Sequence, residues 1–471
     1  MGILSSLESI SEFIPEVKKP TQRKLSFKEK LKWTLAILAA FFVLSLIPLY
    51  GLGGNSFQQF EFLSVILGAS FGSILSLGIG PIVTASIVLQ LLSGSGLLPL
   101  DLTTHEGKKQ FQALQKIGTL FFILFEAGIY VLMGGLTPDP AMVGTAVYTQ
   151  MQFILIAQLA LGGLIVVFMD DVVSKWGFGS GVSLFILANV SQSLFIRAFS
   201  PLHPATNPSA YVGAIPELMR SLSIGDPKTA LLEFFGIAAT VVVFVMCVYG
   251  QAMKIEIPLS FGRVRGYSIR WPLNFLYTSN IPVILASAVL INIQIVGLLL
   301  FNSGISLLGT YSNNQPVSGF AYLASALPSP LTLGNYAAYL SYIIQPYEIL
   351  HIFVYGIVLV VLSVIFGWFW IDSTGMSARD VAKQLERTGL QIPGFRADPR
   401  IIEGVLNRYI PVITILGSAF VGILAWFADI TGALGTGTGI LLTVGILYKF
   451  YEDLAQQQLF EMYPVLKRVV Q

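Results

Sequence analysis

The feature that most constrains this chain is a series of long apolar segments, each of about the length that crosses a bilayer. A helix needs roughly 20 mostly apolar residues to span the hydrocarbon core. The runs lie at about 31–52, 79–95, 115–136, 146–169, 180–199, 232–254, 276–301, 346–370, 408–428 and 438–456. Those at 79–95 and 180–199 are weaker, because they contain glycine, serine and glutamine. The sequence therefore predicts an all-α integral membrane protein with ten transmembrane helices.

The charge content argues against a soluble protein of this length. Charged residues make up 11% of the chain and hydrophobic residues 54%, whereas a soluble domain carries about a quarter of its residues charged. So few charges cannot solvate a soluble surface, and the surplus apolar surface must face lipid. The single cysteine, Cys247, lies in an apolar run and is expected to pack as a small hydrophobic side chain.

The basic residues predict the orientation of the helices. Of the 27 lysines and arginines, only Arg197, Arg220 and Lys228 fall in stretches that are external when the N-terminus is inside. Loops on the cytosolic side of membrane proteins carry an excess of such residues. Both termini are therefore expected in the cytosol, as an N-terminal segment 1–30, which does not resemble a signal peptide, and a tail 458–471.

Two internal echoes predict an inverted repeat. Residues 81–89 resemble residues 282–290, and residues 179–182 resemble residues 437–440. Each echo links a helix to the fifth helix after it, so the two halves cross the membrane in opposite senses, and a functional path is expected at their interface. Chance similarity among small apolar residues explains either echo alone. It explains less readily two echoes that share the same five-helix offset. The expected division is 31–199 for the first half, 200–231 for an external connection and 232–457 for the second half.

The apolar stretch at 60–71 is too short to span. It has about a dozen residues, the length of a re-entrant element, and glycines and serines follow it before Pro81 restarts a helix. Non-helical backbone at membrane depth is tolerated only inside protein or beside a water-filled cavity. A short helix in such a cavity would act as a stopper. An external interfacial helix explains the periodicity equally well.

The patterns that indicate an enzyme, a metal site or a cofactor are absent from the sequence. His105, His203 and His351 are far apart, and neither an HExxH nor a P-loop motif occurs. We therefore expect no catalytic activity and no cofactor.

An intramembrane carboxylate leaves one alternative function open. Glu126 lies mid-span, whereas Asp170, Asp171, Glu348 and Asp429 fall near predicted helix ends. One such carboxylate suffices for ion coupling, so a secondary transporter with inverted repeats is the alternative.

Branched apolar residues at equivalent positions of the echoes point to a different function. They are Val83, Ile284, Val182 and Ile440. They suggest a hydrophobic constriction, although core packing explains each of them taken alone.

Five segments, in this order along the chain, resemble the SecY family. They are residues 78–84, 179–181, 278–284, 408–411 and 437–439. The resemblance extends from residue 27 to the last helix. It is closest to the archaeal branch, which is similar to the alpha subunit of the eukaryotic endoplasmic-reticulum translocon. It implies two five-helix halves that form a clam shell around an hourglass pore in the cytoplasmic membrane.

The resemblance implies roles for particular residues. A ring of apolar side chains would close the waist of the pore: Ile79, Val83, Val182, Ile186, Ile284 and Leu442. Leu442 matches the family ring where the internal echo points to Ile440. The plug, at about 60–72, would include Phe60, Phe62, Leu63, Val65, Ile66, Leu67 and Phe71. Thr84, Glu126 and Asn292 match a polar cluster at a lateral gate, through which apolar segments would enter lipid.

The resemblance also implies partners. Cytosolic loops at about 255–275 and 373–407 would dock on the ribosome and its RNA through Arg263, Arg265, Arg387, Arg396 and Arg400. Positive-inside topology explains the same charges without a docking role. The family channel also works with a SecE-type gamma subunit and a small beta subunit. It conducts the nascent polypeptide and its signal sequence, and it releases membrane segments into lipid.

Overall fold

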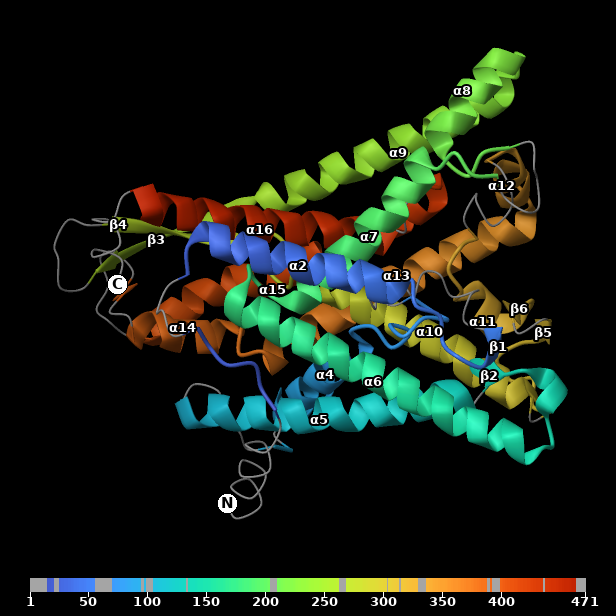
Figure 1. The fold of residues 1–471 in the computed structure, drawn as a ribbon. Coiled ribbons are helices and arrows are strands. Elements are labelled where there is room, and N and C mark those ends of the chain that lie inside the picture. Colours follow the sequence, from blue (N-terminus) through green and yellow to red (C-terminus); the bar gives the residue numbers. More distant parts are fainter. Residues whose placement is uncertain are drawn as a thin grey trace. The chain divides into compact units, whose positions relative to one another are not determined.

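The computed structural model describes most of the chain. The described residues are 15–20, 25–55, 70–94, 97–98, 105–132, 134–203, 210–261, 268–302, 304–312, 315–328, 336–387, 390–391, 399–434 and 437–462. Helices dominate them, and ten long helices coincide one by one with the ten predicted spans (Figure 1). The chain divides into two compact units, one of Met1–Ser191 with Ile446–Gln471 and one of Gln192–Gly445.

The first unit is built from five of these helices. They are α2 (Phe27–Ser45), α4 (Gly80–Gly94), α5 (His105–Leu132), α6 (Ala146–Trp176) and the start of α7 (Gly181–Phe199). Strands β1 (Leu52–Asn55) and β2 (Leu136–Pro138) pair antiparallel, and the short 3-10 helix η2 (Pro140–Met142) follows β2. The helices begin at residues that satisfy free N–H groups: Ser26 accepts a hydrogen bond from the amide of Glu29, and Thr145 from that of Tyr148.

Aliphatic and aromatic side chains make the core of the first unit. A cluster that includes Leu77, Ile123 and Leu155, each 0–1% exposed, joins the turns before α4 to α5 and α6. On α2 and α7, the rings of Phe41 and Phe185 stack at 4.8 Å between centroids. These contacts tie the turns before α4 to α5 and α6, and they tie α7 to α2.

The second unit holds the other long helices and several short elements. Its helices are α8 (Ala214–Ile224), α9 (Pro227–Ala252), α10 (Ile281–Asn302), α11 (Gly319–Leu323), α12 (Tyr336–Ile343), α13 (Pro346–Ser373), α14 (Ala378–Arg387), α15 (Pro399–Thr431) and the start of α16 (Gly437–Met462). Its strands are β3 (Lys254–Phe261), β4 (Ser268–Asn274), β5 (Tyr311–Ser312), β6 (Gln315–Pro316) and β7 (Leu390–Gln391). Proline begins both α9 and α13, where its missing N–H costs nothing.

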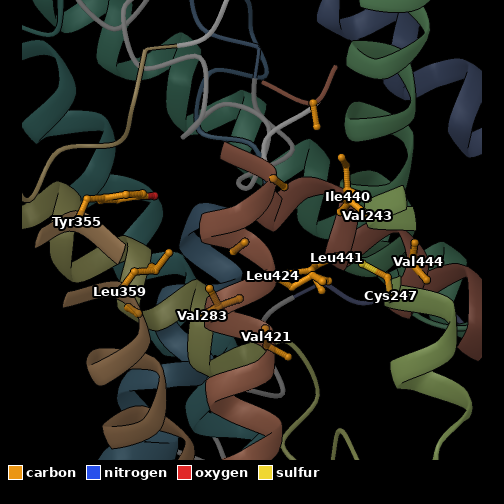
Figure 2. Packing of buried hydrophobic residues seen from close by; sticks show 14 of the residues in the cluster. Val243, Cys247, Val283, Tyr355, Leu359, Val421, Leu424, Ile440, Leu441 and Val444 are labelled. Atoms are coloured by element: carbon orange, nitrogen blue, oxygen red, sulfur yellow. The ribbon is translucent and has the colours of Figure 1, made fainter. Parts of the chain in front are cut away.

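The core of the second unit is a large apolar cluster, shown in Figure 2, to which five long helices contribute. Val243 on α9, Val283 on α10, Leu359 on α13 and Val421 on α15 are each fully buried. Cys247, 1% exposed, packs in the same cluster, as predicted. Burial at this level makes the relative rotation of these helices costly to change.

Strands β3, β4 and β7 form a small sheet that we did not predict. The strand order is β4-β3-β7, and β7 pairs with β3 through Ser260 with Gln391 and Phe261 with Leu390. Between residues 254 and 259, polar and apolar side chains mostly alternate, which is typical of a strand. The structure therefore has two strands where the sequence predicts a cytosolic loop at about 255–275.

Six helices among the described residues are long and apolar enough to cross a membrane by length and composition. They are α6, α7, α9 and the parts Lys109–Leu132, Pro346–Asp372 and Arg400–Thr431 of α5, α13 and α15, while Gly80–Gln90 of α4 is apolar but shorter. Their outer faces carry large exposed apolar side chains, such as Phe153, Phe234 and Ile357 at 69%, 55% and 60% exposure. Such a surface suits lipid and not water.

Candidate functional site

Four of the six expected ring side chains lie in the first unit. Ile79, directly before α4, is 1% exposed, and its carbonyl oxygen accepts a hydrogen bond from the amide of Val83 at 3.1 Å. On α7, Val182 is half-buried and Ile186 is buried. A spacing of four residues places both members of each pair on one face of their helix.

The other two ring side chains lie in the second unit, on helix positions next to core residues. On α10, Val283 belongs to the apolar cluster, whereas its neighbour Ile284 is half-buried. On α16, Ile440 and Leu441 belong to that cluster (Figure 2). Leu442, at 5% exposure, is not among the cluster's described members. Because successive helical residues point about 100° apart, the face that holds Ile284 or Leu442 differs from the face that builds the core.

Two of the three expected gate residues are in direct contact. The hydroxyl of Thr84 on α4 donates a 3.0 Å hydrogen bond to the carboxylate of Glu126 on α5. A second hydrogen bond joins the same helices: the side-chain amide of Gln115 donates to the hydroxyl of Ser86 at 2.6 Å. Asn292 lies on α10, but its side chain falls outside the described part of the structure.

Most of the expected plug falls outside the described residues. These positions are Phe60, Phe62, Leu63, Val65, Ile66 and Leu67. Phe71, which is described, is half-buried, and its ring lies 6.3 Å from that of Tyr130 on α5.

The segment after the plug is a series of turns up to α4, as the glycines and serines predict. Gly72 and Gly78 have φ values of +94° and +53°, which favour glycine. The backbone amide of Gly72 donates a 2.9 Å hydrogen bond to the buried hydroxyl of Ser76. This non-helical backbone is therefore satisfied by its own side chains.

The expected docking arginines are only partly described. Arg263, Arg265 and Arg396 lie outside the described residues. Arg387 is the last residue of α14, and its side chain is also outside them, whereas Arg400 near the start of α15 is exposed.

The structure shows how the two basic loops, at about 255–275 and 373–407, are packed against each other. Besides the β3–β7 pairing, buried side chains pack the two loops together: Leu259 and Leu273 from the hairpin, and Ala382 and Leu385 from α14. The two loops therefore form one module within the second unit.

Sequence reasoning missed the contacts of two half-buried carboxylates with the ring helices. Asp170, on α6, accepts a hydrogen bond from the amide of Val182 at 3.0 Å. Asp429, on α15, accepts one from the amide of Gly437 at 3.0 Å. From the sequence, both are only acidic residues near predicted helix ends. Their signal is positional, because each follows a span and precedes a Gly-x-Gly by about ten residues or fewer.

Comparisons with protein families match nearly the whole chain. A family model described as SecY matches residues 73–451, and one described as the plug domain of Sec61p matches residues 40–72. The chain is 46% identical to the protein translocase subunit SecY of Methanothermobacter thermautotrophicus, over 98% of this chain and 97% of the relative. It is 43% identical to the same subunit of Pyrococcus horikoshii, over 100% of this chain and 99% of the relative.

Solved structures give the same result. A structure described as a protein conducting channel matches with a TM-score of 0.77 and 39% identity, over 97% of this chain and 98% of the other. Sec61 in the canine ribosome–channel complex from the endoplasmic reticulum matches with a TM-score of 0.75 and 38% identity, over the same shares.

Proposed function

Because the chain belongs to the SecY family and is therefore a protein-conducting channel of the membrane, we propose that its six apolar ring side chains form the constriction that a polypeptide passes. The ten-helix fold expected from the sequence is confirmed by the match to solved channels. The relatives matched are translocase subunits, so the secondary-transporter alternative is set aside.

The observation that carries this proposal is the separation of core and ring faces on α10 and α16. Val283 and Ile440 supply the core, whereas Ile284 and Leu442, one and two residues later, do not belong to it. A narrow ring of apolar side chains resists water and ions but binds no particular peptide sequence. Such a ring suits a conduit for many different polypeptides.

The proposal is tested by crosslinking to a stalled nascent chain. Cysteines are placed singly at Val83 and Ile284 in a Cys247→Ala background, and one is placed in the middle of a stalled secretory chain. Val241→Cys on α9, where the native side chain is 56% exposed, is the control for lipid-facing positions. Crosslinks at the two ring positions and none at 241 support the constriction. Their absence, with membrane insertion intact, would overturn it.

We further propose that Thr84 and Glu126, with Asn292, form a lateral gate. The 3.0 Å bond between the first two supports this role, because it occupies the carboxylate in a structural contact rather than leaving it ready for ion coupling. In an apolar seam such groups are costly to leave unpaired. An entering apolar segment would therefore have to compensate for the bond that it displaces.

The plug is proposed at residues 60–72, where the matched plug model at 40–72 ends. The turn-rich segment from Ser70 to Gly78 supports this assignment, because it ties the base of the plug to the start of α4. The amide of Leu49 also donates to the carbonyl oxygen of Gly72 at 2.9 Å, which ties the same segment to the residues after α2.

We propose that both termini and the β3–β4–β7 module lie in the cytosol, and that the membrane is the cytoplasmic membrane. The bias of basic residues away from the opposite side supports this orientation. The module would dock on the ribosome, where RNA phosphates attract arginine; a solved relative was described in a ribosome–channel complex. A SecE-type gamma subunit, a small beta subunit, the nascent chain and lipid complete the proposed partners.

A further inference from the structure

The two units share a device at the start of their ring-bearing helices. In each, a half-buried carboxylate from the preceding long helix accepts a hydrogen bond from a backbone N–H in the first turn of the next one. Asp170 serves α7 through Val182, and Asp429 serves α16 through Gly437, both at 3.0 Å. The first N–H groups of a helix lack partners within the helix, and its N-terminus favours negative charge. The carboxylates therefore fix where α7 and α16 begin.

A glycine at the start of each helix also packs closely against the backbone of the preceding helix. A Cβ added at Gly181 would lie 2.6 Å from the Cα of Asp170, and one at Gly437 would lie 2.3 Å from the carbonyl oxygen of Ala425. Only glycine lets the two backbones approach this closely. The first turn of each helix is thus held against the preceding long helix both by a hydrogen bond and by close backbone contact.

On the other side, Asp429 is itself held in place. Its second carboxylate oxygen accepts a hydrogen bond from the hydroxyl of Tyr355 on α13 at 2.9 Å, and Tyr355 lies in the core cluster (Figure 2). The hydroxyl of Tyr339 donates to the backbone oxygens of Asp429 and Ile430 at 2.8 and 2.9 Å. The carboxylate therefore transmits the position of α13 and α15 to the start of α16.

We propose that Asp170 and Asp429 are positioning residues, which set the rotation of α7 and α16 so that Val182, Ile186 and Leu442 face the constriction. This inference rests on the proposed function. On α7, Val182 itself carries the bonded amide; on α16, Leu442 lies five residues after the bonded Gly437. A rotation of either helix by one residue would break its hydrogen bond and turn a different side chain toward the constriction. The same type of hydrogen bond, from a first-turn N–H to a carboxylate of the preceding long helix, occurs in both units.

The test measures the resting ion conductance of the full-length protein in planar lipid bilayers. Asp429→Ala and Asp170→Ala remove the acceptor, and each should raise the conductance about tenfold, the factor that one lost hydrogen bond is typically worth. Asp429→Asn and Asp170→Asn keep a carbonyl oxygen for the backbone N–H, so they should conduct like the unaltered protein. Tyr339→Phe is the matched control, because it loosens the same end of α15 without touching the carboxylate; it should also conduct like the unaltered protein.

Several outcomes would overturn the inference. Unchanged conductance of both alanine variants would do so, and so would an equal rise in Tyr339→Phe, which would show general loosening. If Asp429→Ala does not accumulate in the membrane, the test rests on Asp170→Ala, Asp170→Asn and Asp429→Asn. A raised conductance in either asparagine variant would contradict the positioning role, because asparagine keeps the hydrogen-bond acceptor. Crosslinking at Ile284→Cys in the unaltered protein separates the two proposals. Its failure overturns the channel constriction, whereas normal crosslinking with unchanged conductance overturns only the positioning role.

Discussion

The side-chain amide of Asn280 donates a 2.7 Å hydrogen bond to the carbonyl oxygen of Leu441. Asn280 directly precedes α10, and Leu441 directly precedes Leu442 on α16. The bond therefore joins two helices that each carry a proposed ring residue within the second unit. Ser279, just before it, has a φ of +56°, a conformation that side chains other than glycine adopt rarely.

A methyl group at Gly445 should disturb that bond. A Cβ there would lie 2.7 Å from the amide nitrogen of Asn280, so Gly445→Ala forces the side chain to move, at a cost of about 1–3 kcal/mol. Thermal unfolding in detergent should show a lower midpoint. Gly404→Ala on α15 is the control, because nothing lies within 4 Å of its added Cβ, and it should be neutral or slightly stabilising. Equal midpoints for the two variants would contradict the argument.

Replacing Thr84 should loosen the contact between α4 and α5. Thr84→Val keeps the shape of the side chain but removes the donor to Glu126, and we expect a loss of about 1 kcal/mol, in the range measured for hydrogen bonds between membrane helices. Thr84→Ser keeps the donor and should retain most of the stability. The same unfolding assay compares the two, and an equally stable valine variant would show that the bond contributes nothing.

Glu217 on α8 should make stability depend on pH. Burial raises the pKa of Glu217, but hydrogen bonds from Arg220 and from the amide of Tyr211 outweigh it and hold the pKa below its ordinary 4.5. A carboxyl with a lowered folded-state pKa stabilises the fold at neutral pH, and this contribution disappears as the pH falls through that pKa.

We therefore expect Glu217→Gln to be less stable than the unaltered protein at pH 7, by about 1.5 kcal/mol, the value typical of a hydrogen bond to a charged group. The difference should shrink toward zero as the pH falls below 4.5. Glu256→Gln removes an exposed pair with Arg270, whose side chain is 78% exposed, and should change little at either pH. A pH-independent gap for Glu217→Gln would show that the carboxylate charge is not responsible.

The sequence was enough to predict the ten helices, because a bilayer requires long apolar runs whatever the neighbouring helices are. The internal echo pointed to Ile440 and only the family resemblance to Leu442, because both residues are apolar; that Ile440 packs with Leu441 and Val444 in the core is visible only in the structure. The roles of Asp170 and Asp429 were hidden for a similar reason. Their partners are backbone amides, which every residue except proline carries and which leave no pattern in the sequence.

The β3–β4–β7 module yields the last prediction, which concerns ribosome binding. Leu259 on β3 is 1% exposed and packs with Leu385 of α14, so Leu259→Ala should cost about 2–5 kcal/mol within the module. Because Arg263 and Arg265 follow this strand and Arg387 ends α14, the loss should separate the two basic loops. Ile255→Ala on the same strand is the matched control, since that side chain is 37% exposed.

Cosedimentation of the reconstituted protein with ribosomes measures this effect. We expect Leu259→Ala to bind ribosomes more weakly and to become more sensitive to trypsin between residues 254 and 274, while Ile255→Ala behaves like the unaltered protein. The ten spans should still insert, because the module lies outside every predicted apolar run. Full ribosome binding by a trypsin-sensitive Leu259→Ala protein would show that the arginines act without the sheet, and the docking role would then belong to the loops individually.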